Sequence, residues 1–151
     1  MTLEPHRHDE SAEGPPRAVA QAIGRGLKLR CPACGEGRLF RAYLKVNDAC
    51  PACGEALHHQ RADDAPPYVV ISIVAHVIVA ALMAVELTWK PEIWVHLVLW
   101  IPLTIAMSLA LLPPVKGALV GLQWALRMHG FGGADDDAHL APAPAGRGPR
   151  A

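Results

Sequence analysis

The sequence predicts a membrane protein with a small cytoplasmic four-cysteine zinc ribbon, followed by a two-helix transmembrane hairpin and a short amphipathic C-terminal helix. Two observations lead to this fold class. The word Cys-Pro-Ala-Cys-Gly occurs at residues 31–35 and again at 50–54, and together the two copies use all 4 cysteines of the chain. Two apolar segments long enough to cross a bilayer follow at 68–89 and 93–112.

The chain begins with a segment that we expect to be a disordered tail, residues 1–24. Its first 16 residues lean acidic, contain several prolines and show no apolar periodicity. Such a composition cannot bury enough apolar surface to offset the entropy of folding.

Residues 25–60 are predicted to form the zinc ribbon. Fifteen residues separate the two Cys-x-x-Cys turns, a spacing typical of zinc sites that take two thiolates from each turn. The glycine after each second cysteine permits the positive φ of a tight turn. Between the turns, residues 37–46 favour a short strand or hairpin arm, with Asn47-Asp48 as its turn. The predicted zinc ligands are Cys31, Cys34, Cys50 and Cys53.

Four thiolates close the coordination shell of zinc, which favours a structural metal over a catalytic one that would keep a position for water. In a reducing cytosol, thiols at this spacing favour metal binding over disulfides. A redox role for either Cys-x-x-Cys turn is the weaker alternative. His58 and His59 are expected to be solvated loop residues, because four cysteines already suffice.

The two apolar segments are predicted to span the lipid bilayer as an antiparallel hairpin, because only three residues, 90–92, separate them. At about 1.5 Å per residue the segments measure roughly 33 and 30 Å, close to the thickness of a hydrocarbon core. Tryptophan and tyrosine lie mostly near the segment ends, where interfacial aromatic rings are favoured. The alternative, two buried helices of a soluble protein, leaves too little chain to cover them.

The distribution of lysine and arginine predicts that both termini are cytoplasmic. The turn contains Lys90 alone, whereas the flanks of the hairpin are rich in basic residues. These are Arg25, Lys28, Arg30, Arg38, Arg41, Lys45 and Arg61 before the first span, and Lys116 and Arg127 after the second.

Polar residues inside the spans are the candidates for a second site. Glu86 and His96 each lie four residues from the turn, so we expect them at similar depth, where they can form a charge-assisted hydrogen bond. The same pair could be half of a metal or proton site, but two donors make a weak site. His76 is expected to hydrogen-bond a neighbouring helix. Pro102 leaves the Val98 carbonyl without its helical donor and predicts a kink.

After the second span, Pro113-Pro114 predicts a helix end and the start of a new helix at 115–129. Apolar residues recur there at helical spacing. This helix could be a cytoplasmic continuation of the span, or an amphipathic helix that lies on the membrane, packs on the ribbon or binds a partner. Residues 130–151, rich in Gly, Ala, Pro and Asp, are expected to be a disordered tail.

The basic segment 17–45 carries seven Lys and Arg residues against one Glu, a local charge of +6. Such a segment could contact nucleic acid. The thiolates of a zinc site and the following acidic residues weaken that reading, and the anionic cytoplasmic leaflet attracts the same sequence. We therefore expect the lipid bilayer as partner, and neither nucleic acid nor a small-molecule substrate.

Several motifs in this order resemble a bacterial family, the domain of unknown function 983. They are Arg30-Cys31-Pro32, Cys34-Gly35, Gly37-Arg38-Leu39-Phe40, the second Cys-x-x-Cys-Gly, the two spans, Pro114-x-Lys116-Gly117 and Gln123-Trp124. The resemblance covers roughly 25–129. It implies a multi-pass protein of the bacterial inner membrane, often encoded near genes for cytochrome oxidase subunits and assembly factors.

Two functional hypotheses follow. In the first, the chain is a non-enzymatic assembly or scaffold factor for a membrane complex, with respiratory oxidase suggested by the resemblance. In the second, it handles metal or redox equivalents through Glu86 and His96 or through the cysteines. We expect no enzymatic activity, because the sequence offers no Ser-His-Asp order, phosphate loop or clustered carboxylate pair. A metal handler should have more donors near the turn than one Glu and one His.

Overall fold

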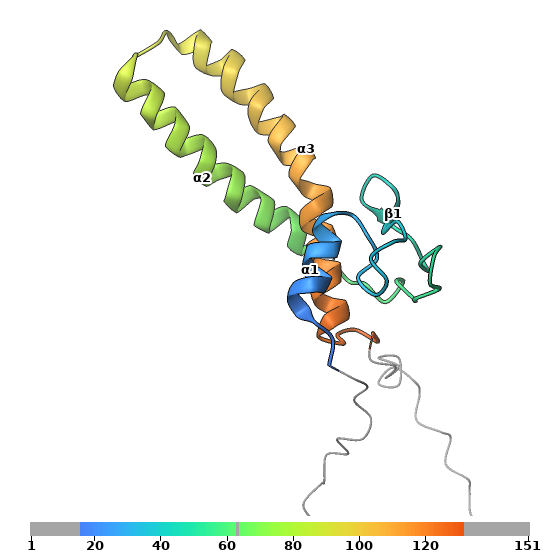
Figure 1. The fold of residues 1–151 in the computed structure, drawn as a ribbon. Helices are drawn as coiled ribbons and strands as arrows, with labels where there is room; N and C mark the ends of the chain where they lie inside the picture. Colours follow the sequence, from blue (N-terminus) through green and yellow to red (C-terminus); the bar gives the residue numbers. More distant parts are fainter. Residues whose placement is uncertain (1–15, 63, 132–151) are drawn as a thin grey trace, which may run out of the picture.

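The computed structural model describes residues 16–62 and 64–131. Two long helices, α2 (Ala65–Thr88) and α3 (Ile93–Ala125), form a hairpin that projects from a base. The base contains α1 (Val19–Leu27), the cysteine loops and the small strands β1 (Phe40–Ala42) and β2 (Lys45–Val46), all gathered around the C-terminal part of α3 (Figure 1). Of the predicted disordered tails, 1–24 and 130–151, the parts 1–15 and 132–151 lie outside the described residues, whereas Phe131 is described and buried.

The helix α1 corrects the prediction of a disordered tail over 1–24, because it begins at Val19. It is held by α3 rather than by its own propensity. A Cβ placed on Gly26 would collide with the Gly117 carbonyl, and one on Gly121 would collide with the Ala22 carbonyl. Ala22 and Gly26 lie four residues apart, as do Gly117 and Gly121, so each helix presents a small-residue face that lets the backbones touch.

Both α2 and α3 are long and apolar enough to cross a membrane, as the sequence predicted. Only 11% of the most apolar part of α2 and 6% of that of α3 is buried within the protein. The two helices therefore leave most of their apolar side chains exposed. Helix α2 begins three residues before the predicted segment 68–89 and ends one residue before that segment ends.

The second long helix corrects the predicted end at residue 112, and of the alternatives for the helix predicted at 115–129, a continuation of the long helix is the one found. It runs without a break through Pro113 and Pro114. A proline at 113 removes the N–H that would bond the Leu109 carbonyl one turn earlier. That carbonyl instead accepts a hydrogen bond of 2.8 Å from the Tyr43 hydroxyl. Tyr43 belongs to the cysteine-containing segment 28–62, which is called the ribbon from here on. The helical bond lost at Pro113 is thereby replaced.

The core of the base is shared between the ribbon and α3. Val120 of α3 is fully buried, and Leu119 and Trp124 pack against the same cluster. Of the alternatives for the amphipathic stripe after residue 114, packing on the ribbon is the arrangement found. The other buried members of this cluster are Cys31, Leu39, Val46, Cys50, Leu57, Ala62 and Phe131.

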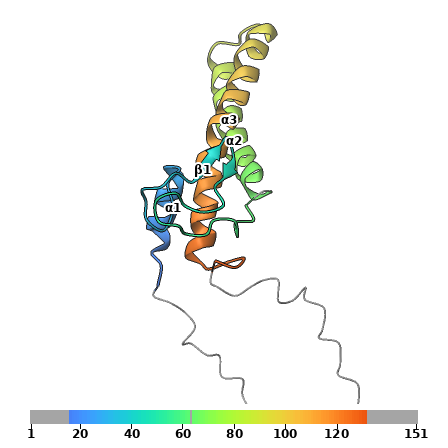
Figure 2. The ribbon, with the colours of Figure 1, turned by 90° about the vertical axis from the view of Figure 1, so that its right-hand side faces the viewer.

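The strands β1 and β2 form an antiparallel hairpin, with Phe40 opposite Val46 and Ala42 opposite Lys45 (Figure 2). Its turn is Tyr43-Leu44, with Leu44 at φ 59°, and not Asn47-Asp48 as predicted. Asn47 follows the hairpin instead, where its side-chain amide donates to the Arg38 carbonyl at 2.8 Å.

Candidate metal centre

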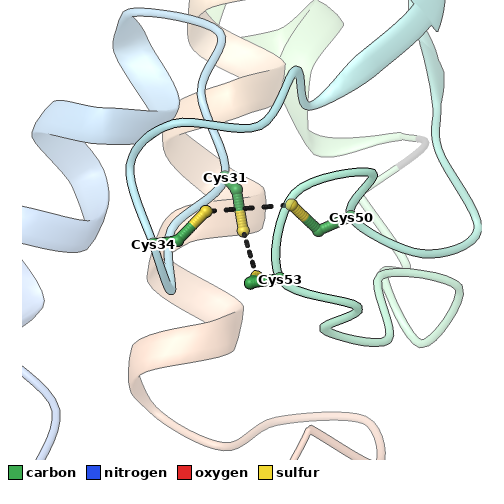
Figure 3. Close-up of side chains that lie close together, drawn as sticks. All are labelled: Cys31, Cys34, Cys50 and Cys53. Carbon is green, nitrogen blue, oxygen red and sulfur yellow. Dashed lines mark hydrogen bonds between the residues drawn. The ribbon is translucent and has the colours of Figure 1, made fainter.

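The four cysteines that the sequence singled out lie together. Their Sγ atoms are all within 4.8 Å of one another. The separations are 3.8 Å between Cys31 and Cys53 and 3.8 Å between Cys34 and Cys50, so each of these pairs joins one turn to the other. Figure 3 shows the sulfur atoms turned toward one another from two separate loops. No cysteine is in a disulfide, and the group can hold a metal ion.

The two Cys-x-x-Cys turns have the same backbone geometry. In each, the N–H of the glycine after the second cysteine donates to the carbonyl of the first, at 2.8 Å for Gly35 and 2.9 Å for Gly54. Both glycines have positive φ, 77° and 75°, as the sequence predicted. Each turn is closed by an isolated β-bridge, 30 with 38 and 49 with 56. The repeated word thus builds two equivalent loops that point their thiols at one place.

Gly37 allows the two turns to meet, a role that the sequence did not reveal. A Cβ at this position would overlap the Cys50 sulfur. The Gly37 carbonyl also accepts from the Cys31 N–H at 2.8 Å and so closes the first turn. Its place two residues after Cys34-Gly35 is the only signal of this role in the sequence.

The electrostatics of the site favour thiolate at one cysteine and oppose it at another. Backbone N–H groups of Gly37 and then Glu36 lower the pKa of Cys34 to about 6. The Glu36 N–H lies 3.4 Å from the Cys34 sulfur. Burial raises the pKa of Cys31, which has no exposed surface. A bound cation would provide the positive charge that stabilises the thiolate form of Cys31, which burial disfavours.

The first turn is fixed to α1 by Arg25. Its guanidinium Nη1 donates to the carbonyl oxygens of Pro32 at 2.9 Å and Ala33 at 2.6 Å. In addition, Arg30 donates to the Glu36 carbonyl at 2.7 Å. The sequence predicts a contact of the basic segment 17–45 with the membrane or with nucleic acid. In the structure, Arg25 and Arg30 of this segment also hold the first cysteine turn in place.

The second turn is fixed to α3 by Trp124. Its indole N–H donates to the Glu55 carboxylate at 2.7 Å. Arg17 lies 4.2 Å from the centre of the indole ring and donates to the Trp124 and Phe131 carbonyls at 2.6 and 3.1 Å. Burial, and then the charge of Arg127, lower the pKa of Arg17. These contacts enclose the end of α3 between the N-terminal segment and the second cysteine turn.

The neighbouring Gln123 makes a third connection of this kind, since its side-chain carbonyl accepts from the Arg61 backbone N–H at 3.2 Å.

The two histidines near the second turn are not part of the cysteine cluster. His58 is exposed as expected, but His59 is part-buried, with its ring 5.8 Å from that of Phe131. The expectation of two solvated histidines therefore fails for His59.

Three side chains of the long helices, Glu86, His96 and Trp100, form a hydrogen-bonded chain. His96 Nε2 lies 3.1 Å from the Glu86 carboxylate, so the structure brings these two together. Trp100, which sequence reasoning missed, donates its indole N–H to His96 Nδ1 at 2.9 Å. An indole N–H only donates, so Nδ1 is the acceptor and the ring proton lies on Nε2, facing Glu86. His76 bonds the Ser72 carbonyl of its own helix at 2.6 Å rather than a neighbouring helix.

The chain is similar to a known protein family. Neither the curated proteins nor the solved structures contain a significant match. The family described as "Protein of unknown function (DUF983)" matches residues 40–124, from β1 to Trp124, which is more than half of the chain. The match includes the second cysteine turn, both long helices and the residues by which α3 joins the ribbon. The chain therefore belongs to the DUF983 family.

Proposed function

We propose that α2 and α3 span the bacterial inner membrane, with the ribbon and both termini in the cytoplasm. The exposure of their apolar side chains supports this, because water would make that surface costly. The exposed aromatic rings give further support. Trp89 and Trp94 flank the turn of the hairpin, and Tyr43 and Tyr68, the chain's 2 tyrosines, lie toward the other end. Such belts are typical of the two membrane interfaces.

The metal is proposed to be zinc with a structural role. At a zinc–sulfur distance of about 2.3 Å, the edge of a tetrahedron is ~3.8 Å. The Cys31–Cys53 and Cys34–Cys50 Sγ–Sγ separations both have that value. Four sulfur ligands fill the tetrahedron and leave no position for a substrate. Iron also accepts four thiolates, so metal analysis has to distinguish the two.

The overall role is proposed to be that of a non-enzymatic scaffold or assembly factor for a membrane complex. The observation that carries the proposal is the shared core of the ribbon and α3, in which Cys31, Cys50 and Val120 are buried together. Metal binding would thereby fix the direction in which the helical hairpin of α2 and α3 projects from the base. The apolar faces of α2 and α3 remain available to a membrane subunit. Respiratory oxidase is the first complex to examine, as the family resemblance suggests.

The alternative, direct handling of metal or redox equivalents, finds less support at the Glu86–His96 pair. Both nitrogens of His96 are already engaged, one by Trp100 and one by Glu86. A metal ion at either nitrogen would first have to displace one of these partners. The cysteines, closed around one point and half of them buried, also favour a structural metal.

The scaffold role is tested by affinity purification of the tagged full-length chain from native membranes. We expect a defined set of integral membrane proteins to co-purify with the wild-type chain. Cys50→Ser should lose this set together with its zinc, whereas His58→Ala, at an exposed position outside the cluster, should retain both. Recovery of the chain without membrane partners, or retention of the whole set by a metal-free Cys50→Ser protein, would contradict the proposal.

A further inference from the structure

The tip of the β1–β2 hairpin lies beside the apolar part of α3 rather than at the far end of the base (Figure 2). The contact that places it there is the 2.8 Å hydrogen bond from the Tyr43 hydroxyl to the Leu109 carbonyl. Leu109 precedes the end of the apolar segment 93–112 by three residues, which at 1.5 Å per residue is about 4.5 Å along the helix. The Tyr43 hydroxyl therefore lies at the depth where hydrocarbon gives way to headgroups.

The side chains around this tip suit an interface with lipid. Tyr43 is 54% exposed although its hydroxyl is bonded, so its ring is accessible to a bilayer. Arg41 and Lys45 flank the two-residue turn and are both exposed. Arg41 shares its charge with Asp48, at 3.2 Å, whereas the side chain of Lys45 makes no hydrogen bond or ion pair within the described residues. An exposed aromatic residue with an exposed basic residue on each side of it in the sequence matches the headgroup region, where tyrosine and cations are both favoured.

We propose that this hairpin tip, Arg41 to Lys45, binds the phosphate groups of anionic lipids in the leaflet on the ribbon's side of the membrane. The proposal rests on the membrane insertion of α2 and α3 proposed above. Its consequence is that the ribbon is held at two places, by the shared core with α3 and by the bilayer surface. The basic residues farther along the base, near Trp124, do not take part. Trp124 is twelve residues beyond Leu112, about 18 Å from the apolar segment and outside a headgroup layer of roughly 5–7 Å.

The test is hydrogen–deuterium exchange of the zinc-loaded full-length protein in lipid nanodiscs, comparing phosphatidylcholine alone with phosphatidylcholine mixed with phosphatidylglycerol. We expect amides of residues 40–46 to exchange more slowly in the anionic discs, by about fivefold for each basic side chain engaged. Lys45→Glu should abolish most of this difference. Arg61→Glu, which makes the same charge change at the exposed residue beside Gln123, should preserve it.

The readout separates this proposal from membrane insertion itself. Amides of α2 and α3 should be protected in both kinds of disc if the helices span the bilayer, whatever the hairpin does. Equal exchange of residues 40–46 in neutral and anionic discs, with α2 and α3 protected, would overturn the lipid contact alone. Unprotected α2 and α3 would overturn insertion. Exchange of the Lys45→Glu hairpin in neutral discs should equal that of wild type, which verifies that the variant still folds.

Discussion

The Tyr43 hydroxyl bonds the carbonyl of Leu109, the acceptor that Pro113 deprives of its helical partner. A residue of the ribbon thus repairs a helix 66 positions away in the sequence. The same bond attaches the β1–β2 hairpin to α3 at the end of the apolar segment. The cysteine ribbon and the second long helix are therefore one structural unit, held by a buried core at Val120 and by this hydrogen bond higher up.

Tyr43→Phe should destabilise this unit, because it leaves the Leu109 carbonyl without a donor. We expect a loss of about 1–3 kcal/mol, the usual penalty for an unsatisfied polar group in an apolar setting. Denaturant unfolding of the purified protein, followed by tryptophan fluorescence, measures it. Tyr68→Phe is the matched control, because the hydroxyl of the exposed Tyr68 makes no hydrogen bond within the described residues. Equal losses in the two variants would show that the bond to Leu109 has no special role.

The crossing of α1 and α3 predicts a strong effect of one methyl group. Gly26→Ala places a Cβ against the Gly117 carbonyl, so the two helices must separate. We expect a destabilisation of about 1–3 kcal/mol, as for other overpacked contacts. Gly24→Ala, on the same helix with nothing within 4 Å of the added Cβ, should instead stabilise by up to about 1 kcal/mol through helix propensity. Thermal unfolding of both variants would contradict the crossing if their changes had the same sign.

How far the sequence predicts this structure depends on the range of the interactions involved. The repeated cysteine word specifies its loops locally, since each turn closes on its own backbone and its glycine takes positive φ. The long helices follow from local composition as well. The continuity of α3 does not, because Pro113 and Pro114 are local helix-ending signals, and the carbonyl that Pro113 leaves without a donor is bonded by a distant tyrosine.

Two further differences have the same origin. The helix α1 is nine residues long, too short to be stable alone in water, and forms against the glycines of α3. The hairpin turn uses Leu44 at positive φ, a residue type that carries no turn signal, so Asn47-Asp48 was the better local candidate. The bond from Trp100 to His96 is a third case, because the sequence predicts only Glu86 as a partner of His96.

Removal of the metal should unfold the base and leave the helical hairpin. We expect one zinc per chain in purified protein, and its loss by chelation or by Cys31→Ser should make the segment 27–57 sensitive to protease. Structural zinc contributes on the order of 10 kcal/mol in such small sites, more than the few local contacts of this segment can replace. Elemental analysis with limited proteolysis provides the measurement. A metal-free wild-type chain that resists protease over 27–57 would contradict the structural role.

The proposed orientation predicts the behaviour of reporter fusions. A reporter joined after residue 129 should be active only if it is one that works in the cytoplasm, and a tag inserted at Pro91 should be reachable from the periplasm. The basic residues of the base, which resist translocation, are the physical reason. Alkaline phosphatase activity from the C-terminal fusion would reverse the orientation.

The chain of Trp100, His96 and Glu86 distinguishes scaffolding from metal or proton handling. Glu86→Gln should be tolerated in a scaffold, because the amide carbonyl still accepts from the proton on His96 Nε2. Membrane hydrogen bonds of this kind average about 0.6 kcal/mol, too little to abolish the hairpin. Trp100→Phe frees His96 Nδ1 and should be the more disturbing change, since Nδ1 loses its donor. The measurements are the abundance of each variant in membranes and the activity of the complex that co-purifies with the wild-type chain. Normal abundance and normal activity of Glu86→Gln would support the scaffold, whereas lost activity at normal abundance would show that the carboxylate itself holds a metal ion or carries a proton.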